Sequence, residues 1–248
     1  MIVYGVNPVL EALRAGRVRR LLVARSGRDR RIDEASALAR TLNVPVERAD
    51  AQALDRAARG GVHQGIAAEL EAPRDYSLRE IVGAAAPDPP LIVVLDGIED
   101  PHNVGAILRT ADAAGCHGVV RQARHAASLG GAVAKASAGA VAHVRVATVV
   151  NNARAVEDLK DLEVWTVGLD ASAGASYDEA DLTVPTALVV GAEGAGLRRL
   201  VRERCDRMVS IPMRGSVASL NVSVAAGVTL FEAVRQRRAL TEELAPPR

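Results

Sequence analysis

Apolar residues follow a repeating pattern in the C-terminal two thirds of the chain. Short apolar runs such as LIVVLD (residues 91–96) and TALVVG (186–191) alternate with segments whose apolar residues recur at helical spacing. Buried strands without polar alternation, separated by helices, are typical of a largely parallel sheet covered on both faces. The pattern predicts an α/β domain over residues 91–248, ending in a long helix from about Ser219 to Leu240.

The N-terminal part of the chain has a shorter pattern of the same kind. Helical spacing over residues 6–13, 32–42 and 51–58 is interspersed with strand-like segments at 19–25, 44–48 and 63–70. We therefore predict a small α/β domain over residues 1–70. Residues 71–90 hold four prolines and little apolar periodicity, so this segment is predicted to be a linker.

Composition excludes several classes of protein. Of the 248 residues, 49% are hydrophobic and 25% are charged, as in an ordinary globular protein. No apolar run reaches the roughly 18 to 20 residues of a membrane span, and the first residues do not resemble an export signal, so a cytoplasmic protein is expected. The two cysteines are far apart and the five histidines lack ligand spacing, so neither a disulfide nor a metal site is expected.

Positive charge is concentrated near the N-terminus. The whole chain is nearly neutral, with 31 basic and 30 acidic residues, but residues 14–31 contain eight arginines and only one acid, Asp29. Such a cluster is either a surface for nucleic-acid phosphates or a solvated face without a ligand. The candidate RNA-binding residues are Arg17, Arg19, Arg20, Arg28, Arg30 and Arg31.

The first of three strand-end motifs is DPHNVGAILRTADAAG, residues 100–115. Asp100 and Pro101 are good helix-start residues, and Gly115 is a good stop. Apolar residues at 104, 107, 108 and 111 would form the core face. Asn103 then falls in the first turn and Arg109 points away from the core, where each is either a site residue or an ordinary cap and surface charge.

The second and third motifs follow later strands. VVGAEGAGL has glycines at 191, 194 and 196, the order GxxGxG, which differs from the GxGxxG of dinucleotide-binding loops. Glu193 within it is either a helix-start carboxylate or a ligand contact. IPMRGSVASLNVSVA leads into the final helix, with Ser219 predicted as the N-cap and Asn221 in the first turn.

Taken together, the three motifs resemble the SpoU or TrmH-like family of RNA ribose 2′-O-methyltransferases, in the SPOUT class. KASAGAVAHV and VVNNARAVEDLK also look like this family. At the N-terminus, YGVNPVLEAL and GVHQGIAAEL are similar to the L30e-like substrate-binding domain of its 23S rRNA guanosine methyltransferases, the group that this chain resembles most. Ala218 stands where many relatives have an acidic residue.

The resemblance implies a C-terminal trefoil knot beside a small L30e-like domain, and a homodimer. It implies a pocket for S-adenosylmethionine formed by main-chain groups of Gly191, Ile211, Met213 and Leu220. It also implies a catalytic set of Arg109, Asn103, Glu193, Ser219 and Asn221, acting on a guanosine ribose in 23S rRNA or in a large-subunit assembly intermediate.

Several alternatives stay open. A tRNA ribose methyltransferase, or a thiostrepton-resistance-type enzyme acting on a 23S rRNA adenosine, would share the chemistry but not the substrate. A catalytically silent RNA-binding protein of ribosome assembly would share only the fold. An NAD-dependent enzyme is opposed by the glycine order of the second motif.

Overall fold

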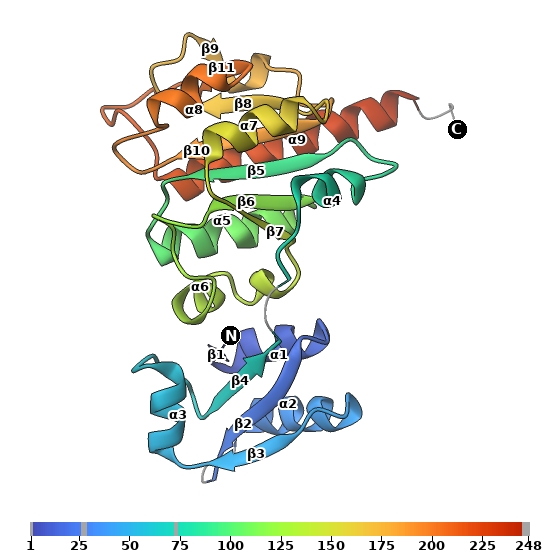
Figure 1. The fold of residues 1–248 in the computed structure, drawn as a ribbon, viewed down its shortest axis with the longest axis vertical. Helices are drawn as coiled ribbons and strands as arrows, with labels where there is room; N and C mark the ends of the chain where they lie inside the picture. Colours follow the sequence, from blue (N-terminus) through green and yellow to red (C-terminus); the bar gives the residue numbers. More distant parts are fainter. Residues whose placement is uncertain (1, 26–28, 72–73, 245–248) are drawn as a thin grey trace. The chain divides into compact units, whose positions relative to one another are not determined.

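The computed structural model describes residues 2–25, 29–71 and 74–244. By contacts, the chain divides into two compact units. The first comprises Met1–Arg74, Val104–Arg109 and Ala127–His143, and the second comprises Asp75–Asn103, Thr110–Ala126 and Val144–Arg248. Both are α/β structures, shown in Figure 1.

The first unit contains a four-stranded sheet with the order β1-β4-β2-β3. Its strands are β1 (Ile2–Tyr4), β2 (Val18–Ala24), β3 (Val46–Ala49) and β4 (Ile66–Leu70). Strand β4 is antiparallel to both β1 and β2, whereas β2 and β3 are parallel. The helices are α1 (Val6–Arg14), α2 (Arg30–Thr41) and α3 (Ala51–Ala58). Leu54 of α3 packs with Tyr4, Leu22 and Ala67 in a buried cluster.

A later segment of the chain belongs to this unit. Helix α6 (Gly131–Ala136) lies against β1, and the short helix η1 (Ala140–Ala142) lies against α1. Gly139 has φ 98°, and a Cβ atom there would lie 2.5 Å from Cβ of Glu11. Only glycine fits both that backbone and that close approach.

The second unit is built on a seven-stranded sheet with the order β7-β6-β5-β10-β8-β11-β9. The strands are β5 (Leu91–Asp96), β6 (Gly118–Gln122), β7 (Val146–Val149), β8 (Trp165–Leu169), β9 (Ala175–Ser176), β10 (Thr186–Gly191) and β11 (Arg207–Ser210). Every pair of neighbouring strands is parallel. The largely parallel sheet predicted for this part of the chain is confirmed.

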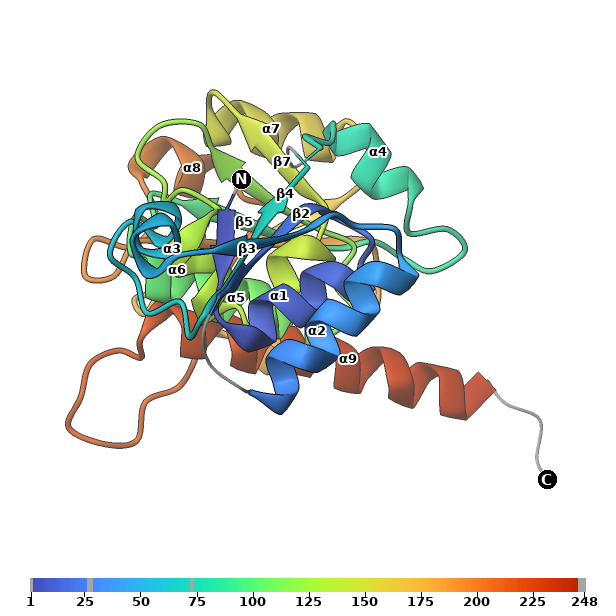
Figure 2. The same cartoon turned by 90° about the horizontal axis from the view of Figure 1, so that it is seen from below.

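Helices cover this sheet on both sides. Helices α4 (Leu78–Gly83), α7 (Asn152–Lys160) and α8 (Arg199–Arg204) lie on one side, and α9 (Val222–Leu244) lies on the other (Figure 2). Helix α5 (Pro101–Ala113) follows β5, and η2 (Tyr177–Glu179) follows β9. None of the helices in residues 2–25, 29–71 and 74–244 combines the length and the apolar character needed to cross a membrane.

The structure differs from the sequence prediction in two places, one helix that was not predicted and one helix that begins later than predicted. Residues 71–90, predicted as a linker, contain α4, which begins with a capping box of Ser77 and Glu80 and buries Ile81 completely. Helix α9 begins at Val222, so the prediction of Ser219 as its N-cap is wrong. The residue immediately before the helix is Asn221, whose Oδ1 accepts hydrogen bonds from N and Oγ of Ser223.

Arg237 ties α9 to the segments that precede two central strands. Its Nη1 and Nη2 donate to the carbonyl oxygens of Pro89 and Pro90, just before β5, at 2.6 and 2.9 Å. Its Nε and Nη2 donate to those of Leu182 and Val184, before β10, at 3.0 and 2.9 Å. Burial lowers the pKa of this guanidinium, and the carbonyl oxygens take the place of water around it.

A buried carboxylate holds together the opposite ends of these strands. Asp96, the last residue of β5, is 0% exposed and accepts hydrogen bonds from the main-chain N, Nε and Nη2 of Arg198. Asn152 at the start of α7 donates its Nδ2 to the same carboxylate at 3.1 Å. Arg198 Nη2 also reaches Oε1 of Gln122 at 2.6 Å, so Asp96 links β5, β6, α7 and the loop after β10.

We expect Asp96→Ala to lower the free energy of unfolding by about 2 to 3 kcal/mol, because Asn152 and Arg198 lose a charged acceptor. The thermal unfolding midpoint would fall by roughly 5 to 10 °C. Asp112→Ala is the matched control: Asp112 is exposed on α5, and such surface changes stay within about 0.5 kcal/mol. Equal midpoints for the two variants would show that Asp96 does not hold the strand ends together.

Candidate functional site

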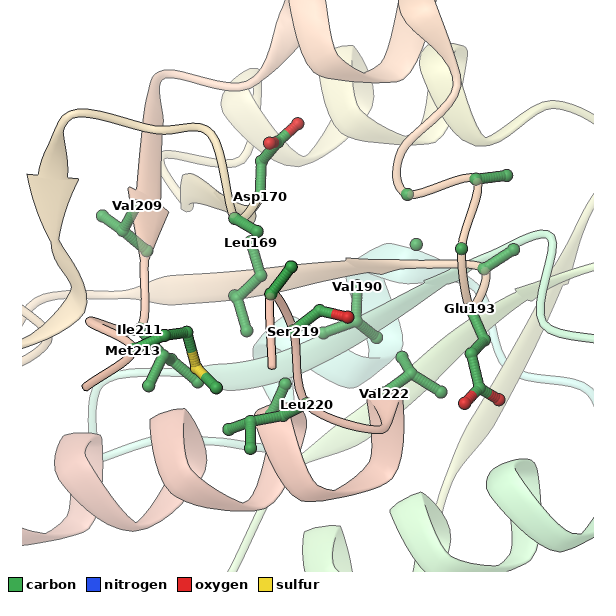
Figure 3. Close-up of a pocket in the computed structure, with 18 of the residues that line it drawn as sticks. Leu169, Asp170, Val190, Glu193, Val209, Ile211, Met213, Ser219, Leu220 and Val222 are labelled. Atoms are coloured by element: carbon green, nitrogen blue, oxygen red, sulfur yellow. The ribbon is translucent and has the colours of Figure 1, made fainter. Parts of the chain in front are cut away.

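A cavity of about 390 Å³ lies at the carboxyl end of the second unit's sheet. Ligands of open parallel α/β sheets bind at this edge, beyond the ends of the strands. Figure 3 shows its walls, which come from the ends of β8, β10 and β11, the segment after β11, and the start of α9. The apolar part of the lining includes Leu169, Val190, Val209, Ile211, Met213, Leu220 and Val222.

The glycines of the second motif shape one wall of this cavity. Main-chain N and O of Ala192 and Gly196 form two hydrogen bonds, of 2.8 and 3.1 Å, which close a tight loop. Gly194 and Gly196 have φ of 77° and 67°, and a Cβ atom on Gly191 would lie 2.2 Å from the carbonyl carbon of Gly196. The order GxxGxG therefore encodes a loop folded back on its own strand, which presents backbone to the cavity.

The four residues predicted to hold the cofactor all line this cavity: Gly191, Ile211, Met213 and Leu220. Glu193 and Ser219, from the predicted catalytic set, line it as well. Two further charged residues in the lining, Asp170 and Arg202, were not predicted from the sequence. Asp170 directly follows β8, and the sequence shows no recognised motif at the end of this strand. Arg202 lies on the six-residue helix α8, where its sequence is typical of a solvent-exposed helix.

Hydrogen bonds bring the three motifs together beside the cavity. Nδ2 of Asn103 donates to Oε2 of Glu193 at 3.3 Å, and Nδ2 of Asn221 donates to Oδ1 of Asn103 at 2.9 Å. Asn103 is buried in the first turn of α5, where the predicted N-cap Asp100 accepts from the backbone N of His102 at 3.0 Å. We call Asn103, Glu193 and Asn221 the polar triad.

Arg109 lies on the same helix as Asn103, six residues later and about 9 Å further along the axis. Its side chain is exposed, as the position of the core face predicted. In the part of the chain that the structure describes, its guanidinium has neither a hydrogen-bond nor an ion-pair partner. The structure thus groups the polar triad and leaves Arg109 with all its donors available for an external anion.

Three of the six arginines proposed for RNA binding have partners within the first unit. Arg17 donates to the carbonyl oxygen of Ala142 at 3.2 Å, and Arg31 hydrogen-bonds Oδ1 of Asn7. Arg20 lies 3.0 Å from a carboxylate oxygen of Glu47 and 3.1 Å from one of Glu69.

The other three arginines differ from these. Arg19 on β2 and Arg30 on α2 are exposed, and no side-chain partner of theirs occurs among the described residues. Arg28 lies outside the described residues. Arg19 and Arg30 are therefore the members of the set whose charge is least neutralised by neighbouring groups.

The two cysteines of the chain are not bonded to each other. Cys116 and Cys205 are unpaired, and burial raises the pKa of each thiol to about 12, so both stay protonated and unreactive. Across residues 2–25, 29–71 and 74–244, His, Cys, Asp and Glu side chains do not gather in a group of three or more that could hold a metal ion.

Known proteins resemble both parts of the chain. Residues 90–231 match the SpoU rRNA Methylase family, and residues 2–76 match the RNA 2′-O ribose methyltransferase substrate binding family. The 23S rRNA (guanosine-2′-O-)-methyltransferase RlmB of Photorhabdus laumondii is 42% identical over 95% of this chain and 98% of its own length. An uncharacterized tRNA/rRNA methyltransferase of Mycolicibacterium gilvum is 46% identical over 96% of this chain and 77% of its own length.

A solved structure gives the same result for the fold. The SpoU methyltransferase AviRb from Streptomyces viridochromogenes, in complex with the cofactor AdoMet, has a TM-score of 0.81 and 31% identity. The match covers 96% of this chain and 91% of that chain. The predicted SPOUT α/β fold, with its trefoil knot and small N-terminal α/β domain, is confirmed. The chain belongs to the SpoU family of RNA methyltransferases.

Proposed function

We propose that this chain transfers a methyl group from S-adenosylmethionine to the ribose 2′-oxygen of a guanosine in 23S rRNA. The observation that carries the proposal is the position of Glu193, which lines the cavity and also accepts the hydrogen bond of Asn103. A methyl donor in the cavity and a ribose at the polar triad would therefore meet at one carboxylate. The names of the RlmB relative and of AviRb with AdoMet support this substrate and this cofactor.

The chemistry of the cavity fits S-adenosylmethionine. Ile211, Met213 and Leu220 offer apolar surface to a flat adenine ring, and the loop at Gly191 offers backbone where a side chain would collide. Glu193 supplies a negative charge that would attract a sulfonium cation. When bound, S-adenosylmethionine supplies the electrophilic methyl group.

In the proposed reaction, the 2′-oxygen would attack the methyl group in line as the S–CH3 bond breaks, with S-adenosylhomocysteine as the leaving group, and the weakly acidic 2′-hydroxyl would lose its proton. Asn103, Asn221 and Glu193 would orient the ribose, while Ser219 shapes the cavity wall next to Leu220. A guanidinium stays charged near neutral pH, so Arg109 acts here as an electrostatic group rather than as a base. It binds the adjoining phosphate and stabilises the developing alkoxide, and the proton leaves to that phosphate or to water.

We further propose that residues 1–70 bind the RNA substrate, that the chain passes from one domain to the other within 71–90, and that 91–248 catalyse methyl transfer in the cytoplasm. The match of residues 2–76 to a substrate-binding family supports the first role. Exposed Arg19 and Arg30 offer guanidinium groups for phosphate contacts.

Methyl transfer from labelled S-adenosylmethionine to unmodified 23S rRNA, with total tRNA in parallel, tests the proposed function. After digestion to nucleosides, we expect label in 2′-O-methylguanosine from 23S rRNA alone. Label in tRNA or in 2′-O-methyladenosine would overturn the substrate but keep the chemistry. An absence of label from naked rRNA and from large-subunit assembly particles, despite cofactor binding, would instead indicate a silent RNA-binding relative.

We expect Arg109→Ala to lower kcat by roughly 100- to 1000-fold, because it removes a group that stabilises charge only in the transition state. The Kd for S-adenosylmethionine should stay unchanged in calorimetry. Arg154→Ala is the matched control, since Arg154 is an exposed helical arginine on α7, and its activity should equal wild type. Complete loss of cofactor binding by a folded Arg109→Ala protein would contradict this role.

We also propose that the chain forms a homodimer through α9. Phe231 is 50% exposed on this helix, and Val234 and Ala239 lie with it along one shallow hollow. The first turns of the same helix, at Val222 and Ala225, line the cavity, so a dimer formed along α9 would lie beside the proposed cofactor site. Arg235, Arg238 and Glu242 line the same hollow, so the apolar residues lie within a charged rim, an arrangement that favours association with a second surface.

Sedimentation equilibrium should give twice the 26.0 kDa mass of one chain. Phe231→Asp should raise the dimer dissociation constant at least tenfold, because it replaces the exposed aromatic side chain of the hollow by a charged group. Val150→Asp, at an apolar residue that is 86% exposed after β7, is the matched control and should leave the mass unchanged. A wild-type monomer, or a dimer insensitive to Phe231→Asp, would contradict association through α9.

A further inference from the structure

The cavity contains a charged pair that the reaction described above does not use. Among its described lining residues, Asp170, Glu193 and Arg202 are the only charged ones, and the rest are apolar side chains, glycines and a serine. Asp170 lies just beyond β8 and Arg202 on α8. The close-up shows Asp170 on the wall next to Leu169, away from Glu193 (Figure 3). The pair and Glu193 are thus separate charged points of one cavity.

Asp170 is held rigidly in its ionised form. Its Oδ1 accepts hydrogen bonds from N and Oγ of Ser172 at 2.8 and 2.6 Å, and its Oδ2 lies 2.8 Å from Nη1 of Arg202. These hydrogen bonds and the positive charge of Arg202 hold the pKa of Asp170 below its usual range. Its side chain is only 15% exposed, so the carboxylate is fixed in place and mostly shielded from water.

Arg202 keeps donors for a ligand. Nη1 contacts Asp170, and Nη2 donates to Oγ of Ser172 at 3.1 Å. A guanidinium has five N–H groups, so these two contacts leave the larger part of its capacity available. Arg202 is 45% exposed, and it lines the cavity, unlike Arg199 one turn earlier on α8, which pairs with Glu203.

We propose that Asp170 and Arg202 bind the amino-acid end of S-adenosylmethionine, with Arg202 on its carboxylate and Asp170 on its ammonium group. This assignment rests on the proposed function, which puts that molecule in the cavity. An adjacent acid and base match the two opposite charges of an α-amino acid. With Glu193 included, the lining has one net negative charge, whereas S-adenosylmethionine with its sulfonium has one net positive charge.

The two charged points of the cavity then have different consequences for turnover. Methyl transfer removes the sulfonium charge and leaves the amino-acid end unchanged. The contacts of Asp170 and Arg202 are therefore equally strong before, during and after the reaction, which is uniform binding. Their loss should raise KM for S-adenosylmethionine and leave kcat unchanged, in contrast to the loss of Arg109.

Calorimetry with two ligands that do not react tests the assignment. S-adenosylhomocysteine has the amino-acid end, and 5′-methylthioadenosine lacks it. We expect Asp170→Asn and Arg202→Gln each to weaken S-adenosylhomocysteine binding roughly 10- to 100-fold, since each removes a charge-assisted contact. Binding of 5′-methylthioadenosine should not change in either variant.

The chain offers a close control for each variant. Asp181 accepts hydrogen bonds from N and Oγ1 of Thr183, as Asp170 does from N and Oγ of Ser172, but it does not line the cavity. Asp181→Asn should therefore bind both ligands like wild type. Arg199→Gln is the control on α8. Arg202→Lys keeps the charge and should retain part of the preference for S-adenosylhomocysteine.

Each outcome decides a separate point. If the wild type binds both compounds and the Asp170→Asn and Arg202→Gln variants weaken both equally, or weaken neither, the pair is structural and this assignment is overturned. An effect from only one of the two variants overturns the two-point contact. A wild-type protein that binds neither compound contradicts the proposed function itself.

Discussion

Asp96 anchors the far end of the glycine loop that forms one wall of the cavity. Its carboxylate is buried at the end of β5, where the parallel strand β10 ends as well, so it has to be satisfied by the protein. Arg198 reaches it from the far side of the glycine loop and meets it with the main-chain N and the side chain together. The glycine loop is therefore held at one end by strand β10 and at the other by the carboxylate of Asp96. This wall of the cavity is preorganised for a ligand.

The polar triad connects the glycine loop to the other two motifs by hydrogen bonds. Asn103 is at the start of a helix that follows β5, Glu193 is in the glycine loop, and Asn221 immediately precedes α9. Each amide both donates and accepts, so a change in one hydrogen bond alters the orientation of the next. In the proposed reaction, binding and chemistry would be divided between different groups: apolar residues, backbone and the Asp170–Arg202 pair would bind the cofactor, whereas the triad and Arg109 would act on the reacting ribose.

Local sequence signals predicted α5 with its cap, its core face and the exposure of Arg109, because helix starts and apolar spacing are short-range features. Family motifs placed Gly191, Ile211, Met213 and Leu220, and all four line the cavity. The Asp96–Arg198 contact spans 102 residues, and no spacing rule reveals such a pair. Helix α4 was missed because its six residues are too few for periodicity, and the start of α9 was misplaced because serine and asparagine cap helices equally well.

Arg237 resists unfolding of α9 from its C-terminal end. Traction on the C-terminal end of α9 meets this side chain before it reaches the turns that line the cavity, and its four hydrogen bonds to carbonyl oxygens must break for the helix to peel further. An unfolding motor that grips this end must therefore break these hydrogen bonds before it can disturb Val222 and Ala225, the residues of α9 that line the cavity.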